Sequence, residues 1–184
     1  MYDVRQHPCF SDDVRGFARL HLPVAPLCNI GCRYCLRRFD CVNESRPGVC
    51  SRVLSPEEAV QLFCRVRDRL PNLTVVGIAG PGDALANFPT VRATLAAIRR
   101  IDPGIRFCLS TNGLRLAEFL PELRALEVDY ITVTVNAMTE GIGERLYSYV
   151  ERSSTRLLGR AAFRYLRTKQ WRGIREAVRQ GICC

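Results

Sequence analysis

Residues 20–35 read LHLPVAPLCNIGCRYC. The first six of them alternate in the manner of a strand, and the residues from 26 to about 52 are rich in Cys, Gly and Arg, which predicts a loop. This order of strand and unusual loop recurs three times further along the chain. The later strands are expected over residues 74–79, 105–109 and 130–135.

Helices are expected between these strands. The first has the clearest start, because Ser55 can cap it, Pro56 suits the first helical position and Glu58 completes a capping box. Two more are expected over residues 91–100 and 116–126. Strands that alternate with helices of these lengths predict an α/β fold with parallel strands and right-handed crossovers, as in a doubly wound sheet or a (β/α) barrel.

The loops that follow the strands are expected to form one site. Besides the cysteine loop, they are Gly80-Pro81-Gly82-Asp83, Ser110-Thr111-Asn112-Gly113 and Asn136. The carboxyl ends of parallel strands lie at the same edge of a sheet, and ligands bind there in folds of this kind. These segments should therefore converge although they are far apart in the sequence.

Length and composition favour one globular domain. The chain has 184 residues, of which 47% are hydrophobic. No run approaches the roughly 20 apolar residues of a membrane helix, and the first 19 residues do not have the pattern of a signal peptide. A cytoplasmic protein is therefore expected, in which ten cysteines are more typical of metal binding than of disulfides.

The net charge of +9 is concentrated near the end of the chain. Residues 1–151 hold 18 Lys+Arg and 17 Asp+Glu, whereas residues 152–184 hold 9 and 1. Within the second range, Arg156, Arg160, Arg164 and Arg167 recur at helical spacing. This pattern is typical of the solvated face of an amphipathic helix, and a nucleic-acid-binding patch is the alternative.

Cys28, Cys32 and Cys35 place three thiolates in one short loop. Such a loop can hold three corners of a [4Fe-4S] cubane and leaves the fourth iron without a ligand from the loop. An open iron can take an exogenous ligand, and the amino and carboxylate groups of S-adenosylmethionine (SAM) suit this position. A closed structural zinc site with Cys41 as its fourth ligand is the alternative.

The Cys-x3-Cys-x2-Cys spacing after the first strand, with Tyr34 before the last cysteine, resembles the signature of the radical SAM family. The resemblance implies a partial (β/α) barrel of the TIM type and reductive cleavage of SAM to methionine and a 5′-deoxyadenosyl radical. In that family a glycine-rich segment after the second strand contacts the SAM amino group. The SAM-binding residues are expected to be Tyr34, Gly80, Pro81, Gly82, Asp83, Ser110, Asn112, Thr132, Thr134 and Asn136. Gly-Pro-Gly alone usually forms a turn, and threonines are also common in strands.

A closer resemblance is to the NifB family of nitrogenase cofactor assembly proteins. It rests on five segments: residues 7–10 (HPCF), 38–41 (RFDC), 43–48 (NESRPG), 77–83 (GIAGPGD) and 108–113 (CLSTNG). It implies fusion of two further [4Fe-4S] clusters, with insertion of a carbide and a sulfur, to give an [8Fe-9S-C] precursor. The partners implied are iron-sulfur cluster donors and nitrogenase cofactor assembly proteins, with neither nucleic acid nor a membrane.

The same resemblance implies ligands for one of these substrate clusters. Cys9, Cys41 and Cys108 match the family positions, and His7 is expected to be a fourth participant. A cysteine such as Cys108, within an apolar strand, would otherwise be assigned to the core.

Glu44 and Arg46 are assigned to catalysis, since an acid can relay protons and an arginine can balance the sulfide charge. Cys64 lies beside Phe63 in the first helix and is expected to pack in the core. The roles of Cys50, Cys183 and Cys184 stay open.

The chain is expected to be a radical SAM core over residues 1–184 with a cluster-binding segment at 1–19. It ends where a fifth strand should begin, so the core is expected to be incomplete after about four β/α units. We expect such a chain to cleave SAM without completing the larger cluster. The alternatives are a radical SAM maturase or activating enzyme with another substrate, and a zinc-binding basic nucleic-acid module.

Overall fold

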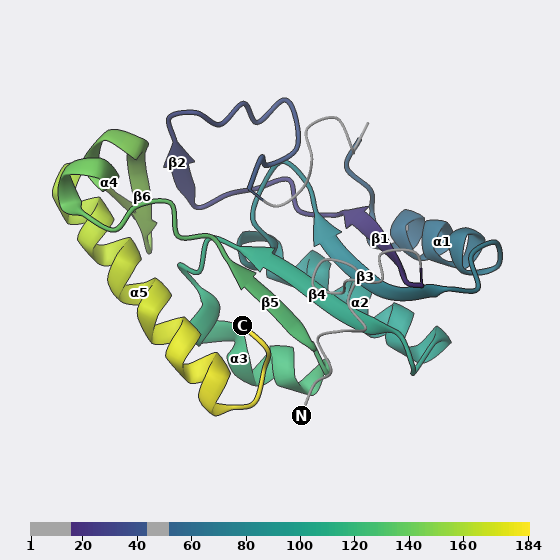
Figure 1. Cartoon of the computed structure of the whole chain (residues 1–184). Coiled ribbons are helices and arrows are strands. Elements are labelled where there is room, and N and C mark those ends of the chain that lie inside the picture. The colour runs from purple at the N-terminus through teal and green to yellow at the C-terminus, as the bar shows by residue number, and fades with distance from the viewer. Residues whose placement is uncertain (1–15, 44–51) are drawn as a thin grey trace.

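The computed structural model describes residues 16–43 and 52–184, and it contains a four-stranded parallel sheet (Figure 1). The strands are β1 (Ala18–Pro23), β3 (Leu73–Ala79), β4 (Arg106–Thr111) and β5 (Tyr130–Val133). They lie side by side in the order β1-β3-β4-β5, and every neighbouring pair is parallel. The expectation of alternating β/α units, as in a partial (β/α) barrel, is confirmed.

Helices connect these strands and cover one face of the sheet. They are α1 (Pro56–Arg67), α2 (Phe88–Ile101) and α3 (Leu116–Ala125), and a short 3-10 helix η2 (Ala84–Asn87) precedes α2. The predicted capping box is present, because the Ser55 hydroxyl accepts from the Glu58 N–H and the Glu58 carboxylate accepts from the Ser55 N–H. This arrangement satisfies two backbone donors at the start of α1.

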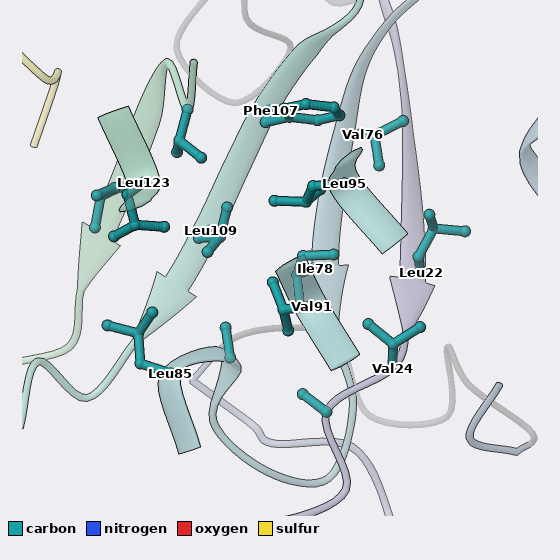
Figure 2. Packing of buried hydrophobic residues seen from close by; sticks show 14 of the residues in the cluster. Leu22, Val24, Val76, Ile78, Leu85, Val91, Leu95, Phe107, Leu109 and Leu123 are labelled. Atoms are coloured by element: carbon teal, nitrogen blue, oxygen red, sulfur yellow. The ribbon is translucent and has the colours of Figure 1, made fainter. Parts of the chain in front are cut away.

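The main core lies between the sheet and these helices. Figure 2 shows strand side chains such as Ile78 and Leu109 facing Val91 and Leu95 of α2. Successive residues of a strand point to opposite faces, so Cys108 faces away from this core and packs with Val75, Tyr130 and Cys183 in a separate cluster. The sheet therefore has one face covered by helices and one face that carries Cys108.

A second, antiparallel sheet stands beside the first and was not expected. It is made of β2 (Ile30–Cys32), β6 (Tyr147–Arg152) and β7 (Thr155–Leu157), in that order. The prediction that the whole cysteine segment is irregular is therefore wrong, since β2 lies within it. Three residues are too few to show a period in the sequence, and the strand forms because β6 supplies its hydrogen bonds.

Two helices complete the described part of the chain. Helix α4 (Glu140–Leu146) leads into β6, and the long helix α5 (Gly159–Arg179) packs along α3 (Figure 1). Arg160 and Arg164 of α5 form ion pairs with Glu144 and Glu140 of α4. The basic helix predicted from the charge pattern is present from Gly159 onward, but Arg156 lies on β7 rather than on the helix. Over residues 16–43 and 52–184, no helix has both the length and the apolar character needed to span a bilayer.

Three strand ends differ from the prediction: β1 ends at Pro23 rather than at residue 25, and β4 and β5 differ as well. β4 continues to Thr111, and β5 ends at Val133 rather than at residue 135, because Thr111 is the last residue of β4 that pairs with it. Beyond α5, Cys183 forms a parallel bridge beside Tyr130: the Ile131 N–H donates to the Cys183 carbonyl at 2.8 Å. The chain thus returns to the free side of β5.

Candidate functional site

A small pocket, with a cavity volume of about 30 Å³ and partly open to solvent, lies where the strand-end loops meet. It brings together four cysteines and side chains that follow β3, β4 and β5. Its lining includes Cys28, Cys32, Cys35, Cys41, Tyr34, Asn43, Pro81, Asp83, Asn112, Thr134, Asn136 and Tyr147. The expected convergence of the loops is therefore seen in the structure.

The cysteine loop is held in shape by its own backbone and by Arg37. The Cys35 N–H donates to the Cys32 carbonyl at 3.1 Å, which closes a turn. The Arg37 guanidinium donates to the carbonyls of Ile30 at 2.6 Å and Cys28 at 3.3 Å, and to the Tyr149 hydroxyl at 2.9 Å. One guanidinium group thus holds two carbonyls at the start of the segment that runs from Cys28 to Cys32.

Burial of Cys28 disfavours its thiolate when no metal is bound. Burial raises the pKa of the Cys28 thiol to about 12, and the nearby Asp83 carboxylate raises it further. A coordinated iron or zinc ion removes this penalty, because it stabilises the thiolate directly. Cys28 is therefore suited to metal ligation and poorly suited to act as a free nucleophile.

The donor chemistry fits an iron-sulfur cluster. Three thiols from one short loop line the same pocket as Asn112 and Asn136, and thiolates are the ligands of such clusters. Within the described residues, no three His, Cys, Asp or Glu side chains are arranged around a point where a single metal ion could bind.

The glycines after β3 allow that loop to pack directly against the cysteine loop. Gly80 has φ +139°, and a Cβ atom there would lie 2.7 Å from the carbonyl oxygen of Ala25. A Cβ on Gly82 would overlap the carbonyl oxygen of Leu27, to which the Asp83 N–H donates at 2.7 Å. A side chain at either glycine would separate the two loops.

Asp83 is a buried carboxylate that joins the ends of β3 and β4. It accepts from the backbone N–H groups of Leu85 at 2.9 Å and Asn112 at 2.6 Å, and from the Thr111 hydroxyl at 2.9 Å. Burial raises its pKa, and these hydrogen bonds oppose the shift. Sequence reasoning assigned Asp83 to SAM binding and missed this connecting role, because Thr111 is distant in the sequence.

Asn112 and Ser110 have different surroundings although both were assigned to the cofactor. The Asn112 side chain lines the pocket, and its Nδ2 atom lies 3.8 Å from Cys28 Sγ and 2.7 Å from Asn29 Oδ1. Ser110 is buried within β4 and is not part of the pocket lining. Asn29 was not predicted, although it stands between Cys28 and Cys32 in the sequence.

Three polar side chains meet at the mouth of the pocket. The Tyr34 hydroxyl accepts from Asn43 Nδ2 at 3.1 Å and also from Asn136 Nδ2. This contact links the cysteine loop to the segment after β5. Of the threonines assigned with Asn136, Thr134 lines the pocket, whereas Thr132 is exposed on β5 and lies outside it.

The cysteines assigned to a second cluster are partly described. Cys41 lines the pocket, and its N–H donates to the Gly80 carbonyl at 3.0 Å. Cys108 is 1% exposed on the sheet face without helices and does not line the pocket. Four predicted site residues lie outside the described residues: His7, Cys9, Glu44 and Arg46. Cys50, whose role was left open, lies outside them too.

Comparison with known proteins gives two findings. The family model of the radical SAM superfamily matches residues 22–182. The FeMo cofactor biosynthesis proteins NifB of Bradyrhizobium diazoefficiens, Klebsiella pneumoniae and Rhizobium meliloti are 44%, 46% and 43% identical to this chain, over 98%, 96% and 97% of its length. The chain spans 36%, 38% and 37% of those three proteins.

The family match begins within β1 and extends past α5, so it contains the last two residues of β1, the other three strands of the parallel sheet, the three-cysteine loop and the loops that meet at the pocket. The resemblance to NifB inferred from short segments is confirmed over nearly the full chain. The chain belongs to the radical SAM superfamily.

Proposed function

We propose that this chain binds a [4Fe-4S] cluster and SAM and acts in nitrogenase cofactor biosynthesis. The observation that carries the proposal is the pocket in which Cys28, Cys32 and Cys35 face the loops that follow β3, β4 and β5. The similarity to proteins named for FeMo cofactor biosynthesis supports the biological role.

The three thiols would hold the cluster, and the opposite loops would bind SAM at its open iron. When bound, the cluster supplies one electron for the cleavage of SAM to methionine and a 5′-deoxyadenosyl radical. Thr134 and Asn136 line the pocket and would bind polar groups of SAM, and Tyr34 would orient Asn136 through their shared hydrogen bond. Asp83 keeps the loops after β3 and β4 at a fixed separation.

The finer proposal is that the radical serves to build the [8Fe-9S-C] precursor from two [4Fe-4S] clusters. A substrate cluster would be held next to SAM by Cys41 and Cys108, with His7 and Cys9 as further ligands, and Glu44 and Arg46 would assist catalysis. Iron-sulfur cluster donors and nitrogenase cofactor assembly proteins would be the partners.

The central claim is tested by changing Cys28, Cys32 and Cys35 together to Ala. We expect the reconstituted variant to produce no 5′-deoxyadenosine from SAM under dithionite, because no thiolate of the loop remains to hold the cluster. Cys64→Ala is the matched control: Cys64 packs against the core from α1 and should leave the cleavage rate unchanged. Production of 5′-deoxyadenosine by the triple variant would refute the proposal.

A further inference from the structure

Asn112 is held by hydrogen bonds to both its backbone groups and its side-chain amide. Its backbone N–H donates to Asp83 Oδ2 at 2.6 Å, and its carbonyl accepts from Gln170 Nε2 at 2.8 Å. Its Oδ1 atom accepts from the Leu114 N–H at 2.9 Å. The residue is 7% exposed, so water offers little competition for these contacts.

These contacts also determine which way the amide points. With Oδ1 facing the Leu114 N–H, Nδ2 must face Asn29 Oδ1 at 2.7 Å and Cys28 Sγ at 3.8 Å. The reverse orientation would place Oδ1 against Oδ1 of Asn29 and two donors against each other at Leu114. The two hydrogens of Nδ2 therefore have two acceptors, one of which is the sulfur of Cys28.

We propose that Asn112 tunes the reduction potential of the cluster bound by Cys28, through an N–H···S hydrogen bond to that thiolate. The inference rests on the proposed function. Reduction adds one electron to the cluster and increases the negative charge on its sulfur ligands, so a donor to sulfur stabilises the reduced state more than the oxidised one. Asn112 is thus a positioning residue that favours reduction of the cluster.

The test is a redox titration with dithionite, monitored by electron paramagnetic resonance, on the reconstituted full chain without SAM. Asn112→Leu removes both N–H donors without adding charge. We expect reduction to become about tenfold less favourable, which is a shift of about 59 mV to more negative potential for a one-electron couple. Asn112→Asp keeps the acceptor for the Leu114 N–H and should shift the potential in the same direction.

Gln170→Leu is the matched control. It removes the donor to the carbonyls of Asn112 and Thr134 and perturbs the same segment, but these hydrogen bonds go to backbone carbonyls and not to a cysteine sulfur. Its potential should equal that of the wild type. An unchanged potential in Asn112→Leu or Asn112→Asp with a full cluster would overturn the proposal.

Loss of the cluster from both Asn112 variants would overturn the proposal too, because Asn112 would then be needed to hold the cluster rather than to tune it. Absence of a cluster from the wild type would instead refute the proposed function.

Discussion

His21 lies on β1 opposite Gly77, and its imidazole is partly buried. Burial lowers its pKa from 6.5 to about 4, and the Arg19 guanidinium acts in the same direction, whereas Asp40 opposes the shift. The folded protein therefore keeps His21 neutral over a range of pH in which the unfolded chain takes up a proton.

We expect this difference to make the free energy of unfolding depend on pH. Between pH 6.5 and about 4 the unfolded state binds more protons at His21 than the folded state, so stability falls as the pH is lowered. His21→Gln removes this contribution, and its free energy of unfolding should fall less over the same range. Urea denaturation of the metal-free protein at several pH values measures the difference. Equal pH dependence in both proteins would show that His21 does not contribute.

Asp83 illustrates how much of a residue's role depends on distant contacts. Its position after a strand could be predicted from the sequence, and so could the pocket that it lines. Its hydrogen bonds to Thr111 and to the Asn112 N–H could not, because they depend on the register between β3 and β4. The three cysteines were easier to predict, since their spacing alone places them in one loop.

At the scale of elements, α4 contains two glycines with opposite surroundings. A Cβ atom on Gly141 would meet no atom within 4 Å, whereas one on Gly143 would overlap the ring of Phe163 in α5. Phe163 is buried, so its ring has little room to move. The contact at Gly143 lets α4 and α5 approach closely.

The two glycines give a prediction with an internal control. Gly141→Ala should stabilise the protein by up to about 1 kcal/mol, because alanine favours the helix and the site is open. Gly143→Ala should destabilise it by about 1–3 kcal/mol, because the new methyl group forces α4 and α5 apart. Chemical denaturation of both variants measures the two changes. A stabilised Gly143→Ala would mean that the close contact of the two helices is absent.

The elements differ in how far the sequence predicts them. Helix α1 was predicted with its first residue, because the capping box is a local pattern. The parallel strands were predicted to within a few residues from their apolar runs. Strand β2 was not, since three residues within a cysteine loop show no period and the strand exists through its pairing with β6.

At the scale of the whole molecule, the cysteines proposed for a second cluster come from three separate parts of the chain. Cys41 follows the cysteine loop and lies in the pocket, Cys108 lies on β4, and Cys9 belongs to the first residues of the sequence. If they share a cluster, changing all three to Ala should remove about four irons per chain.

Iron quantitation after anaerobic reconstitution measures this loss, and the signal of the cluster on Cys28, Cys32 and Cys35 should persist. Cys64→Ala again provides the control. Unchanged iron content in the triple variant would leave a single cluster per chain, as expected for a radical SAM maturase or activating enzyme with another substrate.

The pairing of β2 with β6 also has a consequence for the order of events during synthesis. The Ser148 hydroxyl donates to the Gly31 carbonyl at 2.9 Å across a separation of 117 residues. A ribosome that adds about 5–20 residues per second needs roughly 6–23 s to make that intervening stretch. Throughout this interval β2 of the nascent chain, which ends at Cys32, has no partner strand, so the thiols of the cysteine loop are more exposed to oxidants. Iron and sulfide can therefore enter a finished pocket only after translation has passed β6.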